Sequence, residues 1–211
     1  MSNQVLNDVS WLIASIMRGL LEFPDDRPGV RSVLSRIAEQ DLSTESFAPM
    51  QPARLPACRH LPEAVAAGLL VSSDLCSAIA NIEDQLHWTQ AENYSDDYMG
   101  QPGFMANTAY AEVIGSKGFF RGDDFRLGLM LIGPKLHYRD HRHAASELYW
   151  LLTGPIEYSR DGEDFKSVGT AETIWHEPRV VHAMKTGDRP LLAVWAWTSN
   201  VDELSEIVQS S

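Results

Sequence analysis

The chain has 211 residues and a formal net charge of −12, with 29 acidic against 17 basic residues. This balance repels a phosphate backbone on average and argues against nucleic-acid binding. No apolar run approaches the ~20 residues that cross a bilayer, and Asp8 precedes the first apolar stretch where a signal peptide would be basic. We therefore expect no nucleic-acid or membrane partner, and a cytoplasmic protein in which Cys58 and Cys76 are free thiols.

The first part of the chain is predicted to be helical. Apolar residues recur at spacings of three and four from Val5 to Leu21, which marks one face of a helix that Pro24 ends. Beyond Pro24 the pattern predicts a short helix over residues 30–38 and a proline-rich loop over residues 44–57. A further helical region is predicted over residues 61–88, with a break near residues 68–73. Together these segments predict an N-terminal helical extension over residues 1–104.

Short β-rich runs separated by turn signals replace the helical pattern after about residue 105. Such spacing is typical of a sandwich or barrel, and the lack of a long helix between the runs argues against a parallel α/β sheet. The predicted strands cover residues 126–132, 147–152, 156–159, 171–175, 182–186 and 191–197. The sequence therefore predicts a mainly β fold, with a β-barrel domain over residues 105–211.

Histidines suggest what this barrel carries, because five of the seven lie between residues 137 and 182. His141, His143, Glu147 and Tyr149 share one parity, so a nearly extended backbone would bring them to one side. Imidazoles and a carboxylate are good ligands for one divalent transition metal ion: Zn²⁺, Fe²⁺, Mn²⁺ or Ni²⁺. His182 opens a later strand and is expected to complete the metal ligands with a third imidazole.

The other histidines carry no firm assignment. His137 and His176 could support the ligands from behind, but a plain surface or core role is favoured for each. His60 and His87 lie in the helical region without ligand-like neighbours, and we expect them to serve in packing.

These residues resemble a known superfamily. The spacing H-x-H-x3-E-x6-G from His141 to Gly154 is the first motif of the cupins, and a similar second motif runs from Gly169 to His182. Arg179 stands where a glycine is common, which leaves the geometry of that turn open. The resemblance implies a double-stranded β-helix barrel that holds one metal ion in its mouth. Because cupins often dimerise, a homodimer is also open.

Within the cupins, the chain resembles bacterial dimethylsulfoniopropionate (DMSP) lyases. The segment from His137 to Tyr149 is similar to their metal-site segment, with Tyr138 and Tyr149 as the tyrosine pair. The sequence Cys-Arg-His-Leu-Pro at residues 58–62 and the helical extension are similar as well. The resemblance implies a carbon–sulfur lyase that cleaves DMSP to acrylate and dimethyl sulfide by β-elimination.

The chemistry of this elimination suggests a role for each residue. The sulfonium is already a good leaving group, so the reaction needs a base at the α-carbon and a positive charge near the carboxylate, which the metal would supply. Tyr149 is the expected base, because a nearby cation lowers the pKa of a phenol. Tyr138 is the alternative base or a donor that orients substrate. Trp195 and Trp197 share a face of the last strand and are expected to bind the sulfonium.

Two other functions stay open. The same ligands would serve a cupin Fe²⁺ dioxygenase, whose turnover requires O₂. A non-catalytic cupin that binds a small ligand would bind DMSP without consuming it.

Overall fold

The computed structural model describes residues 2–208, and the N-terminal part is helical as predicted. The predicted break near residues 68–73 separates two helices, but the helix expected to reach residue 88 ends earlier, because Trp88 pairs with Ala111 in a sheet. The α-helices are α1 (Ser2–Leu21), α2 (Val30–Glu39), α3 (Leu61–Gly68), α4 (Ser73–Ile82) and α5 (Asp96–Met99). Short 3₁₀ turns cover Pro56–His60, Glu83–Gln85 and Met105–Asn107.

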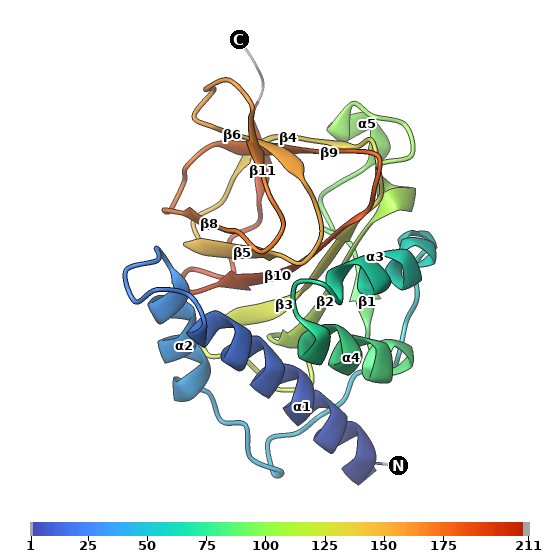
Figure 1. Ribbon diagram of the computed structural model, residues 1–211, viewed down its shortest axis with the longest axis vertical. Coiled ribbons are helices and arrows are strands. Elements are labelled where there is room, and N and C mark those ends of the chain that lie inside the picture. The colour runs from blue at the N-terminus through green and yellow to red at the C-terminus, as the bar shows by residue number, and fades with distance from the viewer. Residues whose placement is uncertain (1, 209–211) are drawn as a thin grey trace.

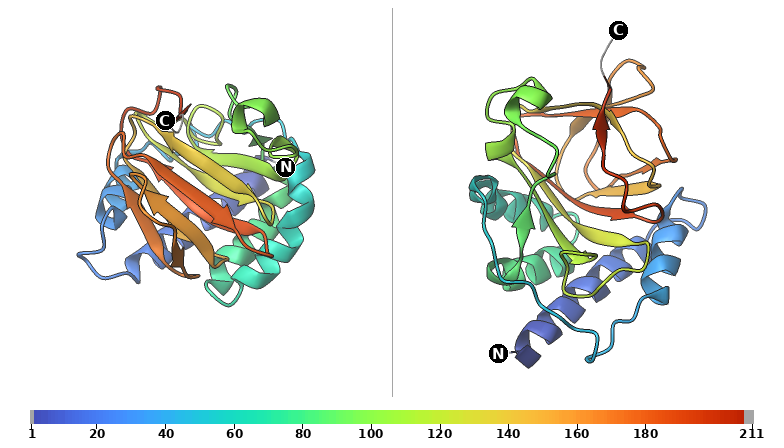
Figure 2. Two further views of the ribbon diagram at one scale, coloured as in Figure 1. Left: turned by 90° about the horizontal axis from the view of Figure 1, so that it is seen from above. Right: turned by 180° about the vertical axis from the view of Figure 1, so that it is seen from behind.

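The rest of the described chain is a β-barrel, as predicted. Its strands are β1 (Trp88–Thr89), β2 (Thr108–Ile114), β3 (Arg126–Ile132), β4 (His137–Arg142), β5 (Glu147–Leu151), β6 (Ile156–Arg160), β7 (Lys166–Val168), β8 (Thr173–His176), β9 (His182–Thr186), β10 (Leu191–Trp197) and β11 (Glu206–Ile207). They form two antiparallel sheets, in the orders β1-β2-β3-β10-β5-β8 and β11-β4-β9-β6-β7. The two sheets face each other around the barrel interior (Figures 1 and 2).

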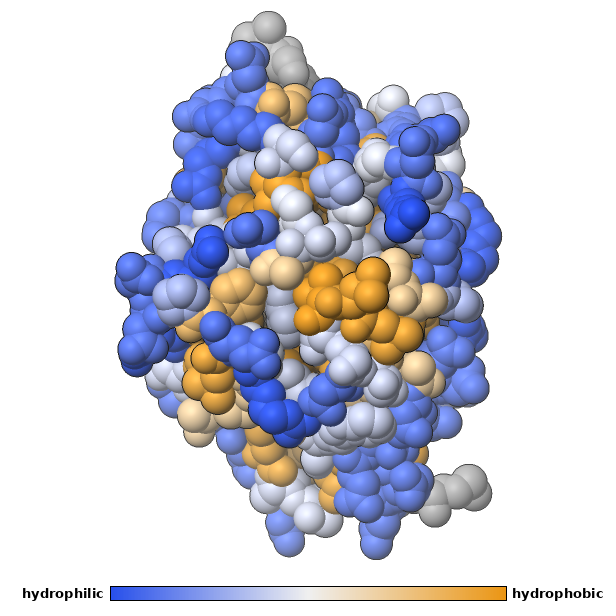
Figure 3. Space-filling view, in the orientation of Figure 1, coloured by the Kyte–Doolittle hydropathy of each residue, from blue (hydrophilic) through white to orange (hydrophobic). Residues whose placement is uncertain are grey.

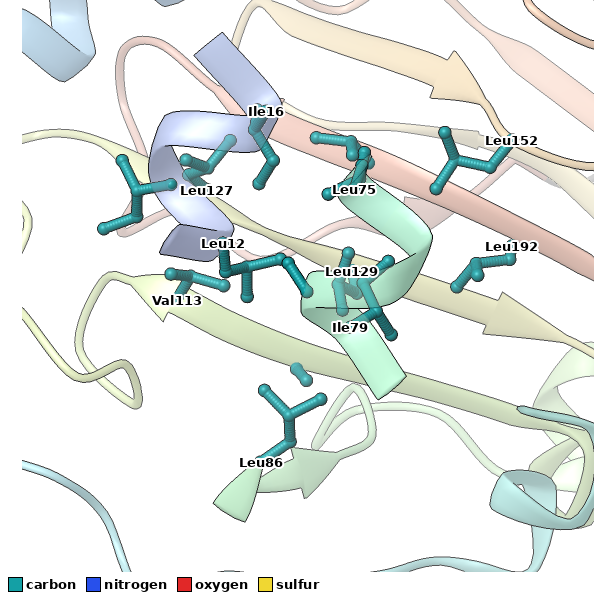
Figure 4. Close-up of a cluster of buried hydrophobic side chains, with 14 of the residues drawn as sticks. Leu12, Ile16, Leu75, Ile79, Leu86, Val113, Leu127, Leu129, Leu152 and Leu192 are labelled. Atoms are coloured by element: carbon teal, nitrogen blue, oxygen red, sulfur yellow. The ribbon is translucent and has the colours of Figure 1, made fainter. Parts of the chain in front are cut away.

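Helices α1 to α4 cover the outer face of the six-stranded sheet (Figure 1). Leu12 of α1 and Leu75 of α4 point toward Leu127 and Leu192 of the sheet (Figure 4), and all four side chains are fully buried. Each buried leucine stabilises the fold by roughly 1.5–3 kcal/mol relative to exposure. The apolar stripe of the first helix is therefore the contact that holds the helical extension on the barrel.

Close packing against β5 fixes the position of α1. Trp150 points away from the barrel interior, as its parity predicts, and meets the edge of Phe23 at a centroid distance of 6.0 Å. A Cβ atom at Gly19 would overlap the Trp150 ring, so only glycine lets the helix approach this closely.

One hydrophobic cluster includes side chains of α1 to α4 and of β2, β3, β5 and β10. A second cluster fills the barrel interior and includes Tyr94 and Phe104, which precede the predicted domain boundary at residues 104/105. Strand β1 also precedes that boundary and pairs with β2. The division into two domains stays a prediction, since the helical extension and the barrel share their packing.

The surface is mainly hydrophilic, with apolar area gathered near the middle of the face seen in Figure 3. The most exposed large apolar side chains include Leu70, after α3, at 94% and Leu21, at the end of α1, at 66%. Within residues 2–208, no helix is long and apolar enough to cross a membrane.

Candidate active site

The four predicted metal-ligating residues come together inside the barrel. His141 on β4 lies opposite His182 on β9, and their ring centroids are 4.0 Å apart. Oε2 of Glu147 lies 3.0 Å from Nε2 of His143 and 3.5 Å from Nε2 of His182. All four side chains are buried. These residues therefore form one compact cluster.

The route by which the chain builds this cluster differs from the prediction. His141 and Glu147 do not lie on one extended strand, because β4 ends at Arg142 and β5 begins at Glu147 in the other sheet. His143 lies in the connection between the two strands. The side chains converge because the two sheets face each other, so the cluster joins both halves of the barrel.

The turn before β9 explains how the second motif works without its usual glycine. Arg179 adopts the left-handed conformation at φ 63°, which glycine reaches without the steric cost that other residues meet. Its backbone N–H donates to the carbonyl of His143 at 2.8 Å, and its guanidinium pairs with Glu203 at 2.9 Å. These contacts hold the turn and keep His182 in register.

The hydrogen bonds of the histidines indicate which nitrogen is free for a ligand. Nδ1 of His141, His143 and His182 lies 2.7, 2.9 and 3.0 Å from a backbone carbonyl. A carbonyl only accepts, so each Nδ1 carries the hydrogen, and the neutral rings of His141 and His182 keep their lone pair on Nε2. Nε2 of His143 instead lies 3.0 Å from Oε2 of Glu147. Metal-bound histidines in proteins are oriented in the same way.

The donor set therefore fits a metal ion. Three ligand atoms, one from each of His143, Glu147 and His182, all lie within 4.8 Å of one another. Nε2 of His182 is buried and makes no hydrogen bond within the described residues, which leaves its lone pair for a cation. His141 is not part of this group, although its ring centroid lies 4.0 Å from that of His182.

Burial and charge shift the pKa values of this cluster in opposite directions. Burial lowers the pKa of His143, but the adjacent Glu147 carboxylate outweighs burial and leaves this pKa above its ordinary value of 6.5. Burial raises the pKa of Glu147, but His143 outweighs that effect, and the pKa falls well below 4.5. Burial lowers the pKa of His182 to about 4. Glu147 is thus ionised and His182 neutral near pH 7, as metal ligands must be.

Both predicted tyrosines reach the same site. Tyr149 is buried on β5, and its ring meets the ring of His182 edge-on at 6.4 Å. Tyr138 stacks on His141 at 4.0 Å, and its hydroxyl donates to the hydroxyl of Tyr94 at 3.2 Å. Burial raises the pKa of both Tyr138 and Tyr149 well above 10.

Both predicted tryptophans also face the cluster, and Trp197 makes a contact that was not predicted. Its indole N–H donates to Oε1 of Glu147 at 2.7 Å, and its ring lies 4.5 Å from that of His143. Trp195 meets the edge of Trp197 at 6.0 Å. A cavity of about 250 Å³ opens onto these side chains and is lined by Tyr138, His141, His143, Glu147, Tyr149, Trp195, Trp197 and neighbouring residues.

Sequence reasoning missed three residues of the site. Tyr110 on β2 lines the cavity, and Tyr94 accepts the hydrogen bond from Tyr138, and neither tyrosine has a motif around it. His176 was left without a firm role, but it is fully buried, and Nδ1 lies 3.2 Å from Oε2 of Glu147. The predicted strand 171–175 stopped one residue short, since β8 includes His176.

The family model of dimethylsulfoniopropionate lyases matches residues 29–193 of this chain, which is well over half of it. The chain belongs to the DMSP lyase family. The resemblance that the histidine and tyrosine motifs predict is thus confirmed.

One curated relative and two solved structures, all named as DMSP lyases, are similar to the chain. The DMSP lyase DddQ of Ruegeria pomeroyi is 29% identical over 99 residues, which are 47% of this chain and 49% of that protein. Its crystal structure has a TM-score of 0.68 at 20% identity and covers 96% of both chains. A chain from the crystal structures of the DMSP lyases RdDddP and RnDddQII has a TM-score of 0.75 at 19% identity and covers 99% of this chain and all of that one. The predicted cupin barrel with its helical extension is confirmed as the fold.

Proposed function

We propose that this DMSP lyase family member is a metal-dependent carbon–sulfur lyase that converts DMSP into acrylate and dimethyl sulfide. The observation that carries the proposal is the buried His143–Glu147–His182 group, of which His143 and Glu147 line the same cavity as Tyr149. About 250 Å³ suits a small substrate rather than a drug-sized molecule.

The proposed metal site consists of His141, His143, Glu147 and His182. Their nitrogen and oxygen donors suit Zn²⁺, Fe²⁺, Mn²⁺ or Ni²⁺. When bound there, the cation would act as a Lewis acid on the substrate carboxylate and would favour ionisation of a nearby phenol.

Tyr149 is the proposed base. Its phenolate oxygen takes the proton from the α-carbon, the C–H electron pair forms the double bond of acrylate, and the C–S bond breaks with its electron pair leaving on sulfur. Dimethyl sulfide departs neutral, so no acid is needed at the leaving group. Tyr138, which stacks on His141, is proposed to orient the substrate or to act as the alternative base.

The aromatic wall of the cavity is proposed to bind the dimethylsulfonium group. Trp195 and Trp197 present ring faces that attract a cation by roughly 0.5–2 kcal/mol each. Glu92 and Glu112 also line this cavity, but Glu92 pairs with Lys117 and Glu112 with Arg126, which balances their charge.

Headspace gas analysis tests the proposal directly. The purified protein is stripped with a chelator, reloaded with each of the four metals and given DMSP, and dimethyl sulfide and acrylate are measured. We expect the two products in equal amounts, dependent on metal and unchanged without O₂. Turnover that requires O₂ would favour a dioxygenase. Binding of DMSP without its turnover would favour a non-catalytic protein. The cytoplasmic location and the homodimer stay predictions.

A further inference from the structure

Glu147 sits in the middle of a row of three side chains that crosses the six-stranded sheet. Strand β5 lies between β10 and β8, and the register places Trp197 on one side of Glu147 and His176 on the other. Trp197 donates its N–H to Oε1, and Nδ1 of His176 lies 3.2 Å from Oε2. Each carboxylate oxygen thus has its own nitrogen neighbour on an adjacent strand.

His176 differs from the metal-ligating histidines in how it meets the cluster. It is fully buried, and its ring stacks on that of His182 at 3.9 Å with an interplanar angle of 20°. The group of mutually close ligand atoms contains His143, Glu147 and His182, and neither His141 nor His176 is part of it. His141 nevertheless lines the cavity, whereas His176 does not. Neither of its ring nitrogens forms a hydrogen bond of good geometry within residues 2–208. The carboxylate of Glu147, 3.2 Å from Nδ1, accepts a hydrogen bond but does not donate one.

We infer that His176 is a positioning residue, which points an Nδ1–H at Oε2 of Glu147 and holds this carboxylate toward the metal from the side opposite Trp197. The inference rests on the metal site of the proposed function. Donors behind a metal ligand fix its orientation, and their loss typically weakens metal binding by about 10–100-fold.

Two substitutions separate this role from simple packing. His176→Leu fills similar space without an N–H, whereas His176→Asn places an amide N–H near the position of Nδ1. We expect zinc affinity, measured by competition with a chromophoric chelator, to fall about 10–100-fold in the leucine variant and to recover largely in the asparagine variant. Tyr158→Phe is the matched control, because it removes a buried hydroxyl beside His176 that has no hydrogen-bond partner within the described residues.

The tautomer of His176 gives a readout that packing alone would not set. Long-range ¹H–¹⁵N NMR spectra of the wild-type protein, with and without zinc, should show the neutral Nδ1–H form for His176. The Nε2–H form would overturn the inference, and so would a leucine variant with wild-type zinc affinity or an asparagine variant as weak as the leucine one.

The experiments distinguish failure of the lyase activity from failure of the role proposed for His176. Wild-type protein that binds zinc and shows the Nδ1–H tautomer but releases no dimethyl sulfide would contradict the lyase activity and leave the role of His176 standing. Wild-type protein that binds none of the four metals would overturn both.

Discussion

The indole N–H of Trp197 donates a hydrogen bond to Oε1 of Glu147 at 2.7 Å, so this tryptophan contacts the proposed metal site as well as the cavity. Its ring face, lying 4.5 Å from His143, was expected only to bind a sulfonium. The two roles can be separated, because one depends on the ring and the other on the N–H group.

Trp197→Phe keeps an aromatic face and removes the N–H. We expect metal affinity to fall about tenfold, while KM for DMSP changes by less than about threefold. Chelator competition and steady-state kinetics measure the two effects. A variant with unchanged metal affinity and a strongly raised KM would show that Trp197 acts only on the substrate.

Tyr149→Phe tests the proposed base. The substitution removes one hydroxyl from a buried ring, and elimination should fall by about 10²–10⁴-fold, the usual contribution of a positioned base. Metal content should stay at the wild-type level, measured by elemental analysis of the same sample. Tyr138→Phe is the comparison, and the assignment fails if it is the variant that loses activity while Tyr149→Phe remains active.

His143→Ala should remove metal and activity together. It deletes a proposed ligand and leaves Glu147 without its closest imidazole. We expect metal affinity to fall by more than about 100-fold, which exceeds the usual effect of groups behind a ligand. His137→Ala, which removes a partly exposed histidine of the same strand region, should keep both properties. A His143→Ala protein that retains stoichiometric metal would remove this residue from the ligand set.

Asp74 should make the attachment of α4 to α1 sensitive to acid. Hydrogen bonds from Trp11 and Arg18 lower the pKa of Asp74 from 3.8 to about 2. Because the pKa is lowered in the folded state, this stabilisation is complete above about pH 5 and disappears as the pH falls through about 2. The carboxylate is 45% exposed, which limits the contribution to about 1 kcal/mol.

Asp74→Asn should therefore lower Tm by about 2–4 °C at pH 7, and the difference from wild type should shrink between pH 5 and pH 2.5. Calorimetry at several pH values measures it. Asp84→Asn, which pairs with Arg54 but is 82% exposed, serves as the control and should leave Tm unchanged. A Tm difference between Asp74→Asn and wild type that does not change with pH would contradict the role of the Asp74 carboxylate.

Gly19→Ala should destabilise the protein, although alanine favours a helix by about 1 kcal/mol. The added methyl overlaps the Trp150 ring, and such overpacking costs about 1–3 kcal/mol. Urea unfolding followed by fluorescence measures the change. Ser10→Ala on the exposed side of the same helix should be neutral or slightly stabilising. A Gly19→Ala protein more stable than wild type would show that α1 can move away from the sheet.

The sequence was most informative where local spacing and geometry coincide. The stripe on α1 predicted its buried face, and the histidine–glutamate spacing predicted the cluster, because both depend on residues close in the chain. For the cluster, however, the predicted reason was incomplete. His141 and Glu147 were expected on one extended strand, but they belong to two different sheets. The left-handed turn at Arg179 also lay outside sequence reasoning, because contacts from distant residues hold it.

The residues that were missed belong to contacts between distant segments. Tyr94 reaches Tyr138 because β1 and the segment after it pack against the barrel, which no local pattern reveals. His176 depends on strand register, since only its place opposite Glu147 turns an ambiguous histidine into a neighbour of the carboxylate. Register is set by the whole sheet, whereas a sequence motif shows only one strand.

The shared packing of helices and sheet has a consequence for protein engineering. We do not expect the barrel to fold without the helices, because its six-stranded sheet is apolar on both faces. Among the described residues, the N-terminal helices are the only layer that covers the outer face of this sheet. A truncated protein that begins at the barrel would expose this apolar face to water and aggregate. Engineered variants of the barrel should therefore keep the first hundred residues.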